Sequence, residues 1–137
     1  MKKKYLIVVA NYYKDISNLL LKSALKEIKL KNSVKIFYVP GVFEIPVVIS
    51  KNLNKFDGFI ALGCVIKGQT PHFEFISNAV TNSILKLSID NKKPIGNGII
   101  TCLNKSQAKR RGFKGSEAAN AMSVSYTHLT LPTICSV

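Results

Sequence analysis

The sequence predicts an α/β domain in which helices cover both faces of a four-stranded parallel sheet. Apolar runs alternate with helical patterns along the chain, and the first run, residues 5–10, is apolar at every position. Such a run is typical of a strand buried on both faces, and parallel strands need a crossover helix between them. With 137 residues, the chain has the length of one ordinary domain.

Four strands are expected at the apolar runs. The first three span residues 5–10, 34–39 and 59–66, and the fourth starts at Pro94 and continues through Ile100. Turn-forming residues bound them, as Pro40 and Gly41 do after the second strand.

The first two helices are expected after the first two strands. Asp15 is expected to cap a helix with apolar side chains at helical spacing. These apolar positions are Ile16, Leu20, Leu21, Leu25 and Ile28. Pro46 suits the first turn of a short second helix, which is expected to end near Asn54.

Two more helices are expected after the third and fourth strands. Thr70 is expected to cap a long helix, with Pro71 in its first turn. The apolar stripe of this helix consists of Phe73, Ile76, Val80, Ile84 and Leu87. Asn104 and Gln107 resemble a capping pair that opens the next helix, which Gly112 ends.

The last segment departs from this alternation. Residues 115–121 begin like an amphipathic helix, but residues 124–133 (VSYTHLTLPT) have neither clear periodicity nor caps and resemble a translated sequencing adapter. We therefore expect a domain at residues 1–123, with its final helix cut after about Met122, and a non-native tail at residues 124–137. This expectation removes His128 and Cys135 from the candidate site residues.

Charge, cysteine content and hydropathy restrict the class of protein. The formal net charge is +13, but the excess is almost all lysine spread along the chain, so we expect solvated lysine faces and no nucleic-acid partner. The three cysteines show no paired spacing and are expected to be buried free thiols. The apolar run near the N-terminus is too short for a signal peptide, and no run could span a membrane. A cytoplasmic enzyme or binding domain remains.

Polar and glycine-containing segments follow the first three predicted strands. These segments are residues 11–13, 41–44 and 67–72. Because the carboxyl ends of parallel strands meet at one edge of the sheet, the three segments are expected to form one ligand site there.

Individual residues at this edge have both a functional and a structural interpretation. Thr70 precedes a helix N-terminus that favours an anion such as phosphate, and it is equally suited to simple capping. His72 is a proton carrier or a half-buried packing residue. Glu44 accepts hydrogen bonds from ligand hydroxyls or supplies negative charge at a helix start. Tyr12 is an aromatic platform or part of the core, and the basic residues 110–114 are an anion site or a solvated face.

Two long motifs resemble a known enzyme family. Residues 39–46 (VPGVFEIP) and 61–73 (ALGCVIKGQTPHF) are similar to those of 6,7-dimethyl-8-ribityllumazine synthases, which act in riboflavin biosynthesis. Residues 94–101 (PIGNGIIT) and 114–118 (KGSEA) extend the resemblance, which covers about residues 5–121. The resemblance implies a flavodoxin-like three-layer sandwich.

The resemblance also implies a reaction. The expected enzyme is a transferase that condenses 5-amino-6-(D-ribitylamino)uracil with 3,4-dihydroxy-2-butanone 4-phosphate and releases phosphate and water. It uses no cofactor and no metal. The alternative is a non-catalytic lumazine- or flavin-binding protein of the same fold, which would keep the ring and ribityl contacts.

By position in the motifs, the resemblance assigns residues to the pyrimidine substrate. Tyr12 would stack on the pyrimidine, where the family more often has phenylalanine or tryptophan, and Asn97 would border the same site. Val42, Phe43 and Glu44 would line the ribityl site. Backbone groups of Cys64, Val65 and Ile66 would hold the uracil edge.

The resemblance assigns a second group of residues to the phosphate substrate. Gln69 and Thr70 would bind phosphate at the helix start, and His72 would shuttle protons. Arg111 from a neighbouring subunit would clamp the phosphate, with Lys114 nearby. The segment between Arg111 and Lys114 looks shorter than the usual loop of the family, which bears on the geometry of this clamp.

The resemblance finally implies partners and location. Members of the family form homopentamers, and some assemble five-fold units into icosahedral shells, in which the final helix packs between subunits. A homo-oligomer, either a pentamer or a larger shell, is therefore expected in the cytoplasm, with riboflavin synthase as a further partner.

Overall fold

The computed structural model describes residues 2–28, 32–69 and 72–130, with side chains up to Val124. A four-stranded parallel sheet runs through the middle of it in the order β2-β1-β3-β4. The strands are β1 (Lys4–Ala10), β2 (Ser33–Val39), β3 (Gly58–Ile66) and β4 (Ile95–Cys102). The predicted α/β class and all four predicted strands are confirmed.

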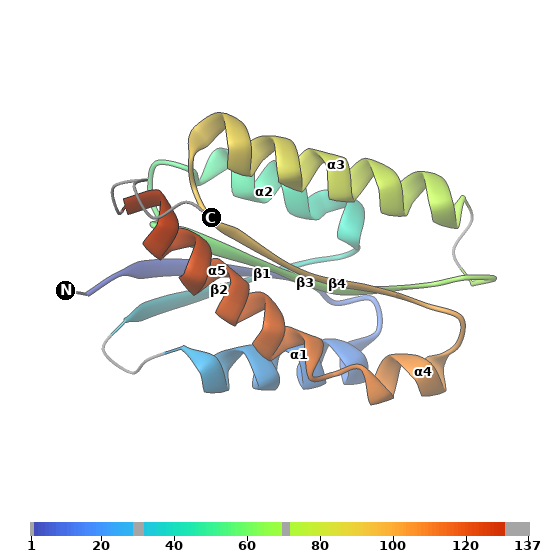
Figure 1. Ribbon diagram of the computed structural model, residues 1–137. Coiled ribbons are helices and arrows are strands. Elements are labelled where there is room, and N and C mark those ends of the chain that lie inside the picture. The colour runs from blue at the N-terminus through green and yellow to red at the C-terminus, as the bar shows by residue number, and fades with distance from the viewer. Residues whose placement is uncertain (1, 29–31, 70–71, 131–137) are drawn as a thin grey trace.

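Helices form a layer on each face of the sheet, as Figure 1 shows. One layer contains α2 (Ile45–Lys51) and α3 (Phe73–Asn91), and the other contains α1 (Lys14–Glu27), α4 (Lys105–Arg110) and α5 (Lys114–Thr130). A 3-10 turn, η1 (Val42–Glu44), leads into α2. Pro46 lies in the first turn of α2, as predicted, but the helix ends at Lys51, and residues 52–55 form turns.

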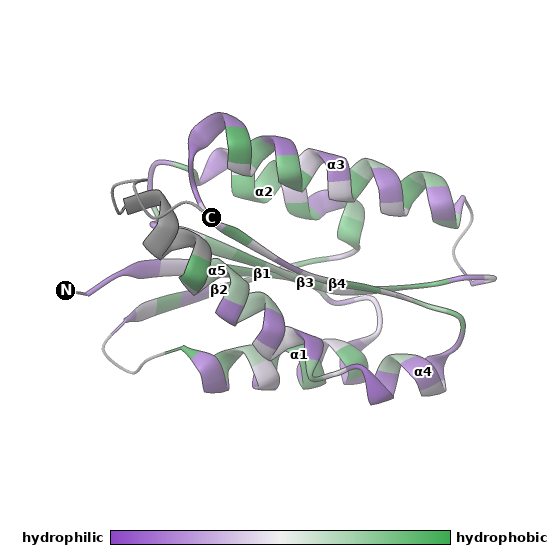
Figure 2. Cartoon of the chain, viewed as in Figure 1, coloured by the Kyte–Doolittle hydropathy of each residue, from purple (hydrophilic) through white to green (hydrophobic). Residues whose placement is uncertain are grey.

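The position of each strand in the sheet explains its sequence pattern. β3 is buried at every position, and β1 is buried from Tyr5 onward, because both strands lie in the centre with helices above and below. The edge strand β4 alternates buried and more exposed residues. Figure 2 shows the apolar strands lying between helices that carry polar residues on their outer sides.

The sheet separates two apolar cores. One core joins β1, β3 and β4 to α1 and α5 and includes Leu20 and Met122. The other joins β1 and β3 to α2 and α3 and includes Ile49 and Ile84. The predicted apolar stripe of α3 faces this second core, which accounts for the length of the helix.

Two predicted helix starts differ from the structure. Tyr13, rather than Asp15, is the residue that precedes α1, and Asp15 lies in the first turn, 3.7 Å from the ammonium groups of Lys105 and Lys109. The prediction that Asp15 caps the helix is therefore wrong. His72 occupies the cap position of α3, and the predicted cap Thr70 lies outside the described residues, as does Pro71.

Other capping and thiol predictions are confirmed. Asn104 accepts a hydrogen bond from the N–H of Gln107 at 2.8 Å, and the side chain of Gln107 accepts one from the N–H of Leu103 at 2.7 Å. Cys64 and Cys102 are buried free thiols. Cys135 lies outside the described residues.

Helix α5 packs tightly against β4 and continues beyond the expected end. A Cβ on Gly96 would overlap the carbonyl oxygen of Ala118, so glycine lets the helix approach the strand. Met122 is fully buried, and the backbone stays helical to Thr130. The helical backbone therefore extends past the residue at which we expected the final helix to be cut. Helical backbone does not decide the origin of the sequence, so the truncation and the adapter origin of residues 124–137 both stay predictions. Among the described residues, no helix is both long and apolar enough to cross a membrane.

Candidate active site

The candidate site lies where the chain leaves two neighbouring strands in opposite directions. β1 and β3 are adjacent, but the segment after β1 leads to α1 on one face, and the segment after β3 leads to α3 on the other (Figure 1). In open parallel sheets, this reversal leaves a crevice beyond the carboxyl ends of the strands. The strand order therefore positions a ligand site between the ends of β1 and β3.

A cavity of about 260 Å3 lies at this reversal. It is lined by the segments after β1 and β2, the end of β3 with the segment after it, and the first turn of α3. The lining residues are Tyr12, Tyr13, Gly41, Val42, Phe43, Cys64, Val65, Gln69 and Ile76. The structure thus brings together the three segments that the sequence indicated. Six of the predicted site residues line this cavity: Tyr12, Val42, Phe43, Cys64, Val65 and Gln69.

The backbone of β3 extends past its neighbour at the cavity. The paired register of β1 and β3 ends at Val9 and Leu62, whereas β3 continues to Ile66. Cys64 and Val65 therefore lie beyond the part of β3 that pairs with β1, and both line the cavity. Ile66 belongs to the same strand but is not a lining residue, and its carbonyl accepts a hydrogen bond from the N–H of Gln69 at 3.2 Å.

Three aromatic side chains line the cavity: Tyr12, Tyr13 and Phe43. Tyr12 is 73% exposed, and its ring meets the ring of Tyr13 edge to face, with centroids 4.8 Å apart. The alternative that Tyr12 belongs to the core is therefore wrong. Phe43 is exposed as well. Such exposed rings can stack on a flat heterocycle and remove both surfaces from water.

Glu44 serves the local backbone at the edge of the cavity. Its Oε1 accepts a hydrogen bond from the N–H of Gly41 at 3.0 Å, which stabilises the start of η1. The structural interpretation of Glu44 is thus supported. The same bond holds the carboxylate beside the lining residue Gly41.

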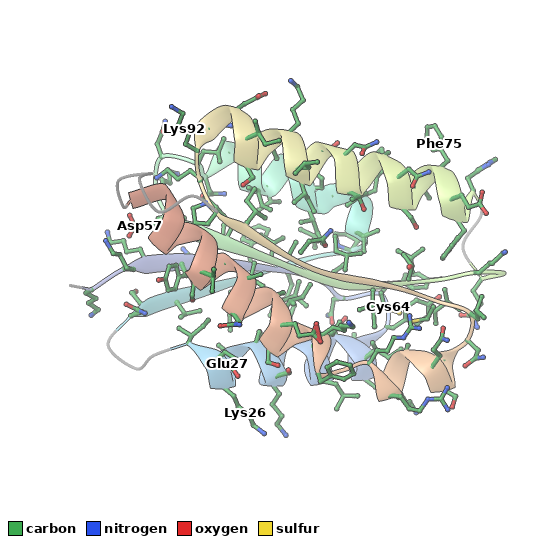
Figure 3. All side chains as sticks on the ribbon, in the orientation of Figure 1. Lys26, Glu27, Asp57, Cys64, Phe75 and Lys92 are labelled. Atoms are coloured by element: carbon green, nitrogen blue, oxygen red, sulfur yellow. The ribbon has the colours of Figure 1, made fainter. Side chains whose placement is uncertain are left out.

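His72 lies at the same edge of the sheet but outside the cavity. Its backbone is left-handed, with φ 56° and ψ 42°, and its side chain is exposed. The imidazole borders an open hollow with Lys67, Glu74 and Phe75, and Figure 3 shows Phe75 directed away from the sheet. The alternative that His72 is a half-buried packing residue is wrong.

The family model of 6,7-dimethyl-8-ribityllumazine synthase matches residues 2–129. The chain belongs to this family. Related sequences agree: the lumazine synthase of Bartonella tribocorum is 40% identical over 89% of this chain and 90% of its own length. Those of Blochmanniella pennsylvanica and Ruthia magnifica are 42% and 39% identical over 88% of this chain, and over 84% and 80% of their own lengths.

Besides Glu44, Ile66 and His72, three more residues that the lumazine synthase resemblance singled out are not among those that line the cavity. Asn97 is exposed on β4, where its Oδ1 accepts a hydrogen bond from the N–H of Ile99 at 3.0 Å. Arg111 donates from Nη1 to the carbonyl of Thr101 at 3.1 Å. Lys114 lies 3.4 Å from Glu117, and its ammonium is 5.3 Å from the ring centre of Phe113. Thr70 lies outside the described residues.

Cys64 is the buried ionisable group of the cavity. Burial among apolar side chains, together with the neighbouring Cys102, raises the pKa of the Cys64 thiol to about 12. A thiol with a raised pKa is mostly neutral at neutral pH, and a neutral thiol is a poor nucleophile. Figure 3 shows Cys64 near the ends of β3 and β4, on the side of the sheet that carries α1 and α4.

Sequence reasoning missed two side chains of the cavity in this lumazine synthase chain. From the sequence, Ile76 was predicted only to belong to the apolar stripe of α3. Tyr13 was predicted only to lie next to Tyr12 in the segment after the first strand. Both line the cavity. For Tyr13, the available signal was its position directly after the end of β1. In the part of the chain that the structure describes, no three histidine, cysteine or acidic side chains gather as a metal site would require.

Proposed function

We propose that this chain performs the reaction that names its family. It condenses 5-amino-6-(D-ribitylamino)uracil with 3,4-dihydroxy-2-butanone 4-phosphate to form 6,7-dimethyl-8-ribityllumazine, phosphate and water. The observation that carries this proposal is the family match over residues 2–129, and the cavity at the strand reversal supports it.

The pyrimidine substrate occupies the cavity in this proposal. The ring of Tyr12 stacks on the pyrimidine, and the backbone of β3 at Cys64, Val65 and Ile66 supplies hydrogen bonds to the uracil edge. This role is supported by the position of Cys64 and Val65 beyond the part of β3 that pairs with β1. A strand end offers N–H donors and C=O acceptors at fixed spacing, which suits a flat ring with both kinds of group.

The ribityl chain extends toward the segment after β2. Val42 and Phe43 contact its carbon atoms, and Glu44 accepts from its hydroxyls through the oxygen that the Gly41 N–H does not use. The fixed position of Glu44 supports this role, because its hydrogen bond to Gly41 already orients the carboxylate. Asn97 borders the pyrimidine from β4.

The phosphate substrate lies near the start of α3. Gln69 and Thr70 hold its phosphate, and Arg111 of a neighbouring subunit clamps the same group, with Lys114 beside it. A helix N-terminus favours an anion through its free N–H groups and its dipole. The guanidinium of Arg111 adds two parallel donors to one phosphate.

The chemistry requires orientation, proton transfer and an anion site. The amine of the pyrimidine attacks the ketone, the carbinolamine loses water to give an imine, phosphate leaves, and the ring closes with loss of a second water. His72 takes up and returns the protons that these steps release. Its exposed imidazole, next to the phosphate-binding segment, supports this role.

The proposed active form is a homo-oligomer, a pentamer or a larger shell, in which each site uses two chains. The position of Arg111 outside the cavity of its own chain supports a contribution to a neighbour's site. We further propose a cytoplasmic location and riboflavin synthase as the enzyme that receives the product. The adapter origin of residues 124–137 belongs with these proposals, and re-reading the DNA beyond the codon for Met122 tests it.

The deciding experiment mixes the purified protein with both substrates. An enzyme accelerates the appearance of lumazine absorbance and fluorescence over the spontaneous condensation. If saturating substrates give no acceleration while the protein still binds lumazine, the alternative of a non-catalytic binding protein replaces the enzyme. The assay is run without added metal or nucleotide, since the proposed chemistry uses neither.

A further inference from the structure

Tyr13 connects the segment after β1 to the segment after β3 at the cavity. Its hydroxyl donates a hydrogen bond to Oε1 of Gln69 at 2.9 Å, across 56 residues of sequence. Its ring meets the ring of Tyr12 edge to face, with an angle of 87° between the planes. All three side chains line the cavity. The loop after β1 and the loop after β3 are thus linked through one residue.

The direction of this hydrogen bond determines what Gln69 can offer to a ligand. The amide oxygen Oε1 is the Gln69 atom that lies 2.9 Å from the hydroxyl of Tyr13, and because this oxygen can only accept, the hydroxyl donates. The amide NH2 group then points away from Tyr13 and keeps two donors. A dianionic phosphate ester accepts such donors and offers no proton in return. The bond to Tyr13 therefore orients Gln69 for an anion.

We propose that Tyr13 is a positioning residue, which fixes the amide of Gln69 for the phosphate group of the second substrate and fixes the ring of Tyr12 for the pyrimidine. This inference rests on the proposed function and deepens it. It assigns to Tyr13 a role that acts through two neighbours. The hydroxyl of Tyr13 orients only Gln69, and its ring orients only Tyr12. A substitution that removes the hydroxyl and keeps the ring therefore tests the first role without disturbing the second.

The key variant is Tyr13→Phe, which removes the hydroxyl and keeps the ring against Tyr12. Gln69 then has to be oriented when the phosphate substrate binds. A hydrogen bond of this kind corresponds to roughly a threefold to tenfold change in affinity. We expect the KM for the phosphate substrate to rise by that factor, with the KM for the pyrimidine unchanged. Calorimetry with inorganic phosphate should show the same weakening without any turnover.

A double-mutant cycle separates positioning from a general structural effect. In a Gln69→Ala background, Tyr13→Phe should cause no further change in the KM for the phosphate substrate, because the amide that it orients is gone. Tyr38→Phe is the matched control, since Tyr38 is half exposed on β2 and is not among the residues that line the cavity. It should leave both KM values unchanged.

Two outcomes overturn the inference while the proposed function stands. In the first, the wild-type protein is active and Tyr13→Phe leaves the KM for the phosphate substrate unchanged. In the second, the effect of Tyr13→Phe is equally large with and without Gln69. Failure of the proposed function differs from both, since the wild-type protein would then not accelerate the condensation at all.

Discussion

Gly63 of β3 and Val42 of η1 are in such close contact that a Cβ on Gly63 would lie 2.7 Å from Cγ1 of Val42. Val42 lines the cavity, and Gly63 immediately precedes the lining residues Cys64 and Val65. The absence of a side chain at position 63 therefore sets how near the segment after β2 comes to β3. This contact joins the two long motifs of the sequence next to residues that line the cavity.

The substitution Gly63→Ala should destabilise the fold and disturb the cavity together. The added methyl group also approaches Ala10, at 3.0 Å from its Cβ, so the strands cannot accommodate it without movement. Overpacking of this kind costs about 1–3 kcal/mol in the free energy of unfolding. Denaturant unfolding measures this cost. Val42→Ala in the same chain should recover part of it, and strictly additive losses in the double variant would contradict the contact as its cause.

Gly96→Ala tests the packing of α5 against β4. Its Cβ would overlap the backbone carbonyl oxygen of Ala118, which moves only if the whole helix moves. We expect a loss of about 1–3 kcal/mol or more in the free energy of unfolding. Asn120→Ala, at an exposed position of the same helix, is the control and should change stability by less than about 0.5 kcal/mol. Equal stability of the two variants would show that α5 does not pack as described.

His72→Ala should slow turnover and leave the fold intact. The side chain is exposed, so its removal deletes no core contact. Proton transfer by a positioned group contributes about 10²- to 10⁴-fold, and a smaller loss is expected here because water can partly substitute. Steady-state kinetics should show a lower kcat with nearly constant KM values. Glu74→Gln, in the first turn of the same helix, controls for a change in charge. A His72→Ala protein that fails to fold would instead assign His72 a structural role.

Arg111 should act on the phosphate substrate across a subunit boundary. Lysine keeps the charge but lacks the two parallel donors of a guanidinium, so Arg111→Lys should raise the KM for the phosphate substrate and leave pyrimidine binding nearly unchanged. Mixed oligomers of His72→Ala and Arg111→Ala chains should regain activity, because some sites then combine two intact halves. Exchange of subunits is verified first by mass spectrometry. If verified mixed oligomers show no activity, the shared site is contradicted. Arg111 then acts only within its own chain, where it donates a hydrogen bond to the carbonyl of Thr101.

Cys64 should resist alkylation in the folded protein. Its pKa of about 12 leaves very little thiolate near pH 8, and Cys102 is buried beside it. Peptide mass spectrometry after iodoacetamide treatment should find Cys64 labelled only in denaturant. Because the folded pKa lies above the usual value of 9.0, the contribution of this thiol to stability is constant below about pH 9 and decreases as the pH rises toward 12. Rapid labelling of the native protein at pH 8 would contradict its burial.

Local patterns were sufficient to predict the sheet and most helix positions. The apolar runs of β1 and β3 identify them as strands covered on both faces, and the helical spacing of apolar residues in α3 identifies its buried side. The cap at Asn104 was also predictable, because a capping pair lies within four residues of sequence. These features depend on residues that are near one another in the chain.

Helix starts were less predictable where loop geometry decides them. Asp15 is a suitable capping residue by type, yet α1 begins one residue earlier, at Lys14. The backbone of His72 is left-handed at the start of α3, a conformation that few residues other than glycine adopt. Neither outcome follows from residue type alone, since each depends on how the preceding strand and loop direct the chain.

The sequence by itself determined the alternation of strands and helices, the family, and the edge of the sheet at which polar segments gather. Each of these follows from periodicity or from contiguous motifs. Long-range packing determined which side chains meet at that edge: Tyr13 with Gln69, and Val42 with Gly63. It also left His72 and Arg111 outside the cavity of the single chain. The physical reason is that such contacts depend on strand order, register and the approach of the helices, which arise only when segments distant in sequence pack together.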